Sequence, residues 1–274
     1  MKSIILIIIL TFVLVENEFA GEIVAKKPGI EWNNVILRNY ATFRSLKDLD
    51  WGSSFLIYYN KNIIACTSRE FTRSIASRYQ LISINDFVKD LIFWKMYLPD
   101  EPSKYILMDS LVLKDRIEKK FSIVTLSRPF FTFALKNIHR RIIPLEPDVN
   151  RIRNKDTLLM VGYTNENKLK ILQGIVETVN NEKYAEDGIR IRTSEYLNFA
   201  DFIGSPVVDK YGKAVGVFSR AYRLKKDRKG RIINESKVVD GSYFEYFVEA
   251  ESMRSILGKD YVSTTEESKG QPTQ

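Results

Sequence analysis

The sequence feature that most constrains the fold is a proline-marked corner followed by two short apolar segments. Gly204-Ser205-Pro206 leads into Val207 and Val208, and an Asp-Lys-Tyr-Gly turn separates these residues from the apolar run 214–218. Apolar β-formers on both sides of a glycine-containing turn predict a β-hairpin. The chain around residue 204 is therefore expected to be β structure built on a tight corner.

Short apolar segments of the same kind recur along most of the chain. The stretch 51–66 predicts two strands joined by a turn at Asn60-Lys61-Asn62. The spacing of apolar residues in 81–97 fits a helix and a strand equally, so no element is assigned there. Many short strands at close spacing favour an all-β barrel or sandwich. The other predicted strands are 35–40, 111–113, 122–127, 157–163, 170–179, 188–193 and 243–248, with short helices at 67–78 and 249–257.

The two ends of the chain differ from its body. A basic start, an apolar run from Ile4 to Val15 and the small residue Ala20 predict a signal peptide over residues 1–20, with an uncleaved anchor as the alternative. The apolar run is shorter than the roughly 20 residues that span a bilayer. We expect an exported protein, periplasmic or extracellular, with an extended lead-in at 21–34 and a disordered polar tail at 259–274.

One cysteine and one histidine limit the chemistry available to this chain. Cys66 has no partner for an intrachain disulfide, and together with His139 it is too little for a zinc site, so no metal or cofactor is predicted. The basic neighbours of His139 favour a solvated linker histidine over a general base. Cys66 lies on an apolar strand and is expected to be a core residue rather than a nucleophile paired with His139.

In chain order, these segments resemble the trypsin-like serine proteases. Gly204, Ser205, Pro206, Val207 and Gly216 match the nucleophile region of that family, which reads Gly-Asp/Asn-Ser-Gly-Ser/Gly-Pro-Val before a glycine-containing hairpin. Other segments resemble further parts of the family in the same order: 55–66, 122–126, 140–147, 158–163, 174–179 and 249–257.

The resemblance implies an all-β fold of two six-stranded Greek-key β-barrels with a short C-terminal helix. The first β-barrel is expected at 35–138 and the interbarrel linker at 139–156. The second β-barrel and the terminal helix are expected at 157–258. The protein is expected to be a monomer.

The resemblance fails at the positions that perform the chemistry. The general-base histidine falls at Ser68, the orienting aspartate falls at Ser122 (or Phe121 with a shift of one residue), and Ile203 replaces the nucleophilic serine. A triad needs a hydroxyl, an imidazole and a carboxylate. Asp201 replaces the glycine that usually supplies an oxyanion-hole N–H. We therefore expect no catalytic residues and no enzyme, but an exported homologue of these proteases that lacks the triad and binds or regulates a partner.

Two alternatives remain open. The chain could be an active serine endopeptidase or other hydrolase with non-standard catalytic residues, although Ser205 falls where the family usually has a structural residue. It could instead be an unrelated β-rich exported binding protein that uses the basic hairpin 220–231. This segment has seven basic residues and one acidic residue and would suit an anionic partner. A solvated hairpin explains it as well, and without a series of stacking aromatics nucleic acid is not expected. The candidate anion-binding residues are Arg220, Arg223, Lys225, Lys226, Arg228, Lys229 and Arg231.

Overall fold

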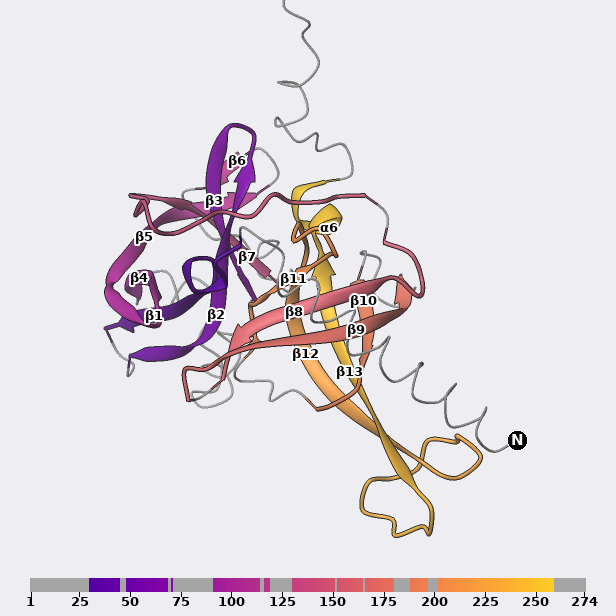
Figure 1. The fold of residues 1–274 in the computed structure, drawn as a ribbon. Coiled ribbons are helices and arrows are strands. Elements are labelled where there is room, and N and C mark those ends of the chain that lie inside the picture. The colour runs from indigo at the N-terminus through magenta and orange to yellow at the C-terminus, as the bar shows by residue number, and fades with distance from the viewer. Residues whose placement is uncertain are drawn as a thin grey trace, which may run out of the picture.

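A computed structural model of the chain consists mainly of antiparallel strands around two barrels (Figure 1). The structure describes residues 30–44, 48–68, 70, 91–113, 116–118, 130–150, 152–164, 166–179, 188–196 and 202–258. Among them, no helix has the length and apolar character needed to cross a bilayer. A short 3-10 helix, Trp32–Asn34, leads into the first strand.

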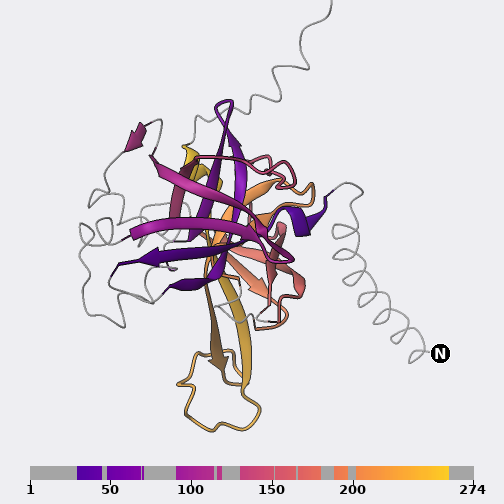
Figure 2. The ribbon, with the colours of Figure 1, turned by 90° about the vertical axis from the view of Figure 1, so that its left-hand side faces the viewer.

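The first barrel closes through six strands in the order β4-β1-β2-β3-β7-β5, with β4 paired to β5. The turn between β2 and β3 is the predicted one, and Asn60 and Lys61 both have positive φ, as a tight two-residue hairpin requires. A seventh strand, β6, pairs with β5 outside the ring. Figure 2 views this barrel from its outer side. The strands are β1 (Leu37–Phe43), β2 (Leu49–Tyr59), β3 (Asn62–Ser68), β4 (Leu91–Leu98), β5 (Glu101–Leu113), β6 (Arg116–Glu118) and β7 (Phe130–Leu135).

The second barrel closes through six strands in the order β10-β13-β12-β11-β8-β9. The proline corner leads into β11, and the predicted hairpin is the β11–β12 pair. Its strands are β8 (Thr157–Tyr163), β9 (Leu169–Val179), β10 (Gly188–Thr193), β11 (Pro206–Val208), β12 (Ala214–Lys226) and β13 (Tyr243–Ser252), followed by α6 (Met253–Leu257). β12 and β13 continue together beyond the barrel and form a projecting arm, defined here as residues 220–249 (Figure 1).

The core consists of three groups of buried side chains, one in each barrel and one between them. One fills the first barrel around Trp94 and Phe133, and one fills the second around Phe202 and Phe218. The third lies between the barrels and joins residues such as Phe55 and Val161 with the terminal helix. The chain between β7 and β8 crosses this interface, because Leu145 bonds to β2 and Glu146 accepts a hydrogen bond from Ala214.

The predicted fold class is confirmed: the protein has two closed six-stranded antiparallel barrels and one short C-terminal helix. The helix predicted over 249–257 is wrong in its first half, because 249–252 extends β13 and the helix begins only after Ser252. The Ser252 hydroxyl caps it by accepting a hydrogen bond from the Ser255 N–H at 3.1 Å. The strand predicted at 122–127 lies entirely outside the described residues, and so does most of the helix predicted at 67–78. The first two residues of that helix, Thr67 and Ser68, instead end strand β3.

Candidate interbarrel site

The corner at Gly204 is the point where the second barrel contacts the first. Residues 202–205 form a turn in which the Ser205 N–H donates to the Phe202 carbonyl at 2.8 Å. Gly204 has φ +81°, and a Cβ on it would lie 2.1 Å from the Ser53 carbonyl oxygen of the first barrel. Only glycine fits such a position, since a side chain would be strained and would also overlap backbone. The adjacent Ile203 carbonyl accepts a hydrogen bond from the Ser53 N–H at 2.6 Å.

A buried polar network in the first barrel supports this contact. Asn39 donates from Nδ2 to the Ser53 carbonyl at 2.9 Å and to Thr67 Oγ1 at 3.1 Å. Thr67 in turn donates to the Ser53 carbonyl at 2.8 Å, and Asn39 Oδ1 accepts from Trp94 Nε1 at 3.1 Å. All these polar groups are buried, where an unpaired group is costly, so the network fixes one position for Ser53. We call Asn39, Ser53, Thr67, Ile203 and Gly204 the interbarrel joint.

The structure brings two of the three triad-equivalent positions together at the joint. The Cβ position of Gly204 lies 3.0 Å from the Ser68 backbone nitrogen, and Ile203 is the preceding residue. Ser68 ends β3 in a buried position, with its hydroxyl accepting a hydrogen bond from the Glu70 N–H at 3.2 Å. The side chain of Ile203 is buried and has no nucleophilic atom. Ser122, Phe121 and Asp201 lie outside the described residues.

The other groups considered from the sequence lie in structural positions. Ser205 is buried, and its hydroxyl oxygen lies 2.6 Å from where a Cβ on Gly162 would stand, inside the second barrel. Cys66 is fully buried in the core between the barrels, and burial raises the pKa of its thiol. His139 lies in the connector after β7, where its ring nitrogen accepts a hydrogen bond from the Arg141 N–H at 3.3 Å. Within the described part of the chain, His, Cys, Asp and Glu form no group of three that could hold a metal.

Beyond the corner, the outer edge of β12 has no strand partner among the described residues. On this edge the Phe218 N–H donates to the Ser205 carbonyl at 2.8 Å, and the Phe218 carbonyl accepts from the Gly204 N–H at 2.9 Å. The next backbone hydrogen bond on this edge among the described residues runs from the Ile233 N–H to the Lys225 carbonyl at 2.9 Å. Because backbone groups on one edge of an antiparallel strand recur every second residue, Ala221 and Arg223 point their N–H and C=O groups to the same edge as Lys225. Within the described part of the chain, a short strand edge therefore has no partner, and it begins beside the joint.

Arg220 directly precedes Ala221 on β12. Its Nε and Nη2 both donate to the same oxygen, Oε2 of Glu249 on β13, and this hydrogen bonding raises the pKa of the Arg220 guanidinium. Glu70 of the first barrel shifts that pKa in the same direction, so the field at Arg220 comes from both barrels. The basic run 220–231 drew attention to Arg220, but sequence reasoning missed its acidic neighbours Glu249 and Glu70, which lie far away along the chain.

Most of the predicted anion-binding residues have partners within the arm. Lys225 donates to the backbone carbonyls of Glu235 and Lys237. Among these seven side chains, Lys229 is the one that has no partner within the described residues. Exposed ion pairs are weak, so they would compete little with an external anion for these side chains. The anion site therefore stays a prediction. The remaining pairs are Arg220–Glu249, Arg223–Glu235, Lys226–Glu245, Arg228–Asp240 and Arg231–Asp227.

The arm also has contacts between aromatic and cationic side chains on both of its faces, which sequence reasoning missed. Arg190 lies over the Phe247 ring at 4.2 Å from its centroid, and Phe247 stacks on Tyr222 at 5.5 Å. Nearer the end of the arm, Arg223 lies over Phe244 at 4.7 Å. The signal available in the sequence was the aromatic-rich run of β13, but its cationic partners come from two other strands, β10 and β12.

No family model and no curated protein matches this chain. The fold matches a solved structure of an alanine-substituted HtrA-type protease AlgW with decapeptide, at 12% identity and a TM-score of 0.50, over 86% of this chain and 63% of that one. AlgW with tripeptide gives 15% identity and a TM-score of 0.47, over 84% and 62%. The Rv3671c protease from M. tuberculosis, active form, gives 11% and 0.48, over 89% and 86%. This chain therefore covers less than two thirds of the AlgW chains.

The protein thus has the two-barrel fold of the trypsin-like serine proteases. This finding corrects one prediction. We expected the chain not to be an enzyme. That prediction is contradicted, because the solved structure that shares its fold is a protease. At 12% identity the likeness establishes the fold alone, and the site must be argued from its own residues.

Proposed function

We propose that this chain is exported and uses a protease-type scaffold, with the triad residues replaced at Ser68, Ser122 and Ile203, to bind an extended segment of another protein. The segment adds as a strand to the free edge of β12 at Ala221 and Arg223. The single observation that carries the proposal is this unpaired edge beside the joint.

Physical reasons favour an extended polypeptide as the ligand. Main-chain hydrogen bonds supply affinity when a peptide joins a sheet edge, and side chains beside the edge supply selectivity. Arg220 and Arg223 flank Ala221 and are both exposed, so they are available to a ligand's acidic groups once Glu249 or Glu235 is displaced. The buried joint holds the start of the edge in one position, which lowers the entropic cost of binding.

The test uses the purified chain and unfolded casein as the probe. We expect casein to slow hydrogen exchange at the Ala221 and Arg223 amides, because both N–H groups then donate to the bound strand. Ala221→Pro removes one of these donors without removing a bond to β13, and we expect it to weaken casein binding at least about tenfold. Ala221→Ser is the matched control, since it changes the same side chain but keeps the N–H donor and should retain most of the binding.

Protection confined to other strands, or equal binding by Ala221→Pro, would contradict the edge as the binding site. Catalysis is measured in the same samples through casein cleavage and reaction with a fluorophosphonate. Labelling of a serine would contradict the proposed replacement of the triad and would identify the nucleophile directly.

A further inference from the structure

The loop 227–242 at the end of the arm exposes aliphatic side chains far from any core. Val238 is 95% exposed and Ile232 is 64% exposed, and Tyr243 at the base of the loop is 44% exposed. Ile232 forms an isolated bridge with Lys226, which pairs on its other edge with Tyr243, so Ile232 and Tyr243 lie on the two sides of β12 at the end of the arm. Figures 1 and 2 show that this end projects away from both barrels.

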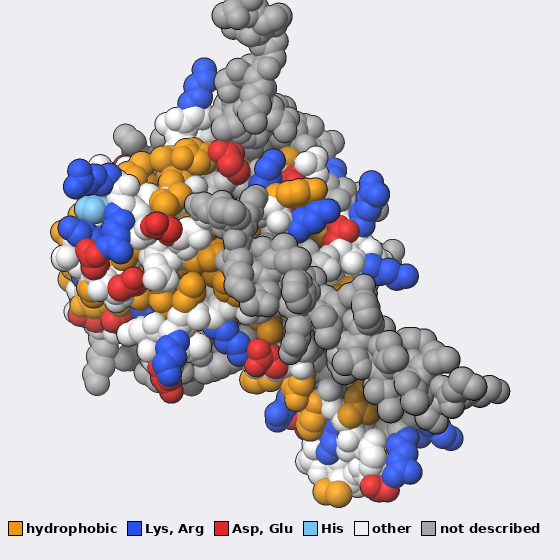
Figure 3. Space-filling model, viewed as in Figure 1, with side chains coloured by type: hydrophobic (Ala, Val, Ile, Leu, Met, Phe, Trp, Pro, Cys, Tyr) orange, Lys and Arg blue, Asp and Glu red, His pale blue; other side chains and the backbone are white. Residues whose placement is uncertain are grey.

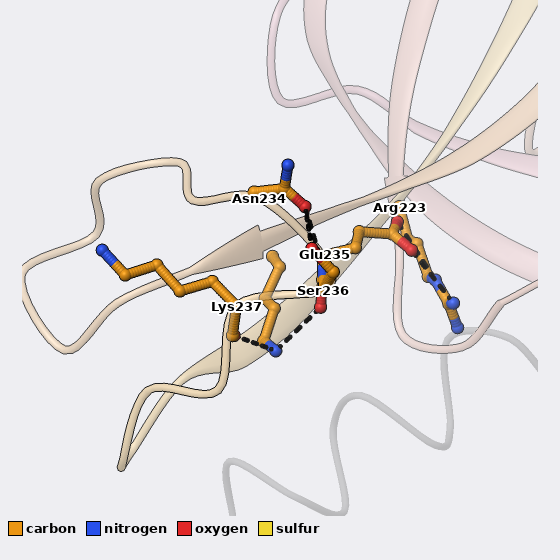
Figure 4. A network of polar contacts seen from close by, with 6 residues as sticks. Arg223, Asn234, Glu235, Ser236 and Lys237 are labelled. Carbon is orange, nitrogen blue, oxygen red and sulfur yellow. Dashed lines mark hydrogen bonds and ion pairs between the residues drawn. The ribbon is translucent and has the colours of Figure 1, made fainter.

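The loop is held in place by the polar network shown in Figure 4. Arg223 forms two contacts to the Glu235 carboxylate at 3.3 and 3.2 Å. Lys225 donates to the Glu235 carbonyl at 3.1 Å and to the Lys237 carbonyl at 2.8 Å, next to Val238. Ser236 donates to Asn234 Oδ1 through both its N–H and its hydroxyl. The exposure of Val238 is therefore fixed by hydrogen bonds to β12, and it does not depend on an unstructured loop.

The charge around these aliphatic groups is positive. Residues 220–249 contain eight basic and five acidic side chains, in a chain with a formal net charge of +8. The ammonium groups of Lys229 and Lys237, both exposed, have no acidic partner within the described residues. Figure 3 shows hydrophobic and cationic side chains together on the arm.

Shape, charge and exposed apolar groups favour one kind of surface. A projecting end that exposes Val238 and Ile232 can enter the headgroup layer of a bilayer ahead of either barrel. Apolar insertion plus attraction to anionic lipids is the usual basis of peripheral membrane binding. We propose that the loop 227–242 docks the arm onto a membrane that contains anionic lipids, with Val238 and Ile232 inserted and Lys229 and Lys237 at the phosphates.

The test places an environment-sensitive fluorophore at the tip through Val238→Cys in the full chain. The native Cys66 is fully buried and does not compete for the label. The matched control is Tyr211→Cys, at an exposed position in the β11–β12 turn at the opposite end of β12. We expect vesicles of phosphatidylglycerol and phosphatidylcholine to shift the emission of the tip label to the blue and to leave the control label unchanged. Phosphatidylcholine alone should give a much smaller shift.

Charge reversal distinguishes the tip from the general positive charge of the chain. Lys229→Glu with Lys237→Glu should raise the lipid concentration for half-maximal shift at least about tenfold, because each basic group near an anionic surface contributes about fivefold. Lys136→Glu with Lys210→Glu changes the net charge equally on the body and should have little effect. The proposal would be overturned by equal shifts at both labels or by no shift at the tip. Equal losses in both double variants, or a tip shift produced by polyglutamate in place of vesicles, would also overturn it.

Discussion

The interbarrel joint and the arm use polar groups in opposite ways. In the joint, Asn39 and Thr67 are buried and bond to the Ser53 carbonyl, so they fix Ser53, whose N–H donates to the Ile203 carbonyl of the second barrel. In the arm, charged pairs such as Arg228–Asp240 lie largely exposed to solvent. Exposed pairs contribute little to stability, whereas unpairing a buried group is costly. The joint therefore serves the architecture, and the arm has side chains that a partner can recruit at small cost.

The largest effect is expected from adding one methyl group at the joint. Gly204→Ala should lower the free energy of unfolding by at least about 3 kcal/mol, because the new Cβ overlaps the Ser53 carbonyl at a positive φ. Gly230→Ala in the arm is the matched control: its φ is +78°, but the nearest atom is Tyr243 Oη at 3.9 Å. It should cost only about 1 kcal/mol. Urea unfolding of both variants measures the difference, and equal losses would contradict the role of the joint.

A smaller effect is expected from breaking the buried network. Asn39→Leu removes the donor to Ser53 and the acceptor for Trp94, and we expect a loss of about 2–3 kcal/mol. Glu235→Gln weakens the exposed pair with Arg223 and should change stability by no more than about 0.5 kcal/mol. Thermal and urea unfolding give both values. A loss from Glu235→Gln as large as that from Asn39→Leu would show that the arm also supports the fold.

The smallest expected effect is a difference in pKa between the aspartates of two similar turns, 209–213 and 227–231. Asp209 accepts from the N–H groups of Tyr211 and Lys213, and Asp227 accepts in the same way from Lys229 and Arg231. Burial raises the pKa of Asp209, which lies in the body near Asp148. The hydrogen bond from the Arg231 N–H lowers the pKa of Asp227, whose hydrogen-bond partners all belong to its own turn on the arm. On acidification, Asp209 should therefore take up its proton first.

The sign of the stability effect follows from these pKa directions. The lowered pKa of Asp227 means that its contribution is present above the ordinary value of about 3.9 and is lost as the pH falls through the lower, folded value. The raised pKa of Asp209 acts on stability in the opposite direction. Asp209 favours the folded protein when it is protonated at low pH, and this contribution is lost as the pH rises through the raised pKa. Amide NMR of Gly212 and Gly230 between pH 6 and about 2 reads both turns, with Asp209→Asn and Asp227→Asn as controls. The reverse order of titration would contradict this comparison.

The limits of sequence reasoning show most clearly in the first barrel. The Asn60–Lys61 turn and strand β8 were predictable because their turn residues and apolar runs are local signals. Strand β4, in contrast, lies in a segment of ambiguous spacing, since two of its first three residues are exposed and its later residues are buried without alternation. Only the last three residues of β5 were predicted, because its earlier part includes Pro102, Lys104 and Asp109 and is stabilised by pairing with β4 and β7. Pairing of this kind depends on residues far away in the sequence.

The candidate site divides in the same way. The corner, its resemblance to a nucleophile turn and the residues at positions 68 and 203 were readable from the chain, but the contact of Gly204 with Ser53 and Ser68 was not. The basic run 220–231 was also visible, whereas its pairing with Glu235, Asp240, Glu245 and Glu249 was not. Glu245 and Glu249 come from β13, which only the β12–β13 register brings opposite, and Glu235 and Asp240 come from the loop between the two strands.

The two aspartate turns give the clearest division. The sequence by itself determined that 209–213 and 227–231 turn, because each has an aspartate followed three residues later by a glycine with positive φ. Only the tertiary structure decided that one carboxyl is harder to ionise than normal and the other easier. The reason is that turn geometry depends on neighbouring residues, whereas the cost of a charge depends on how much of the protein surrounds it.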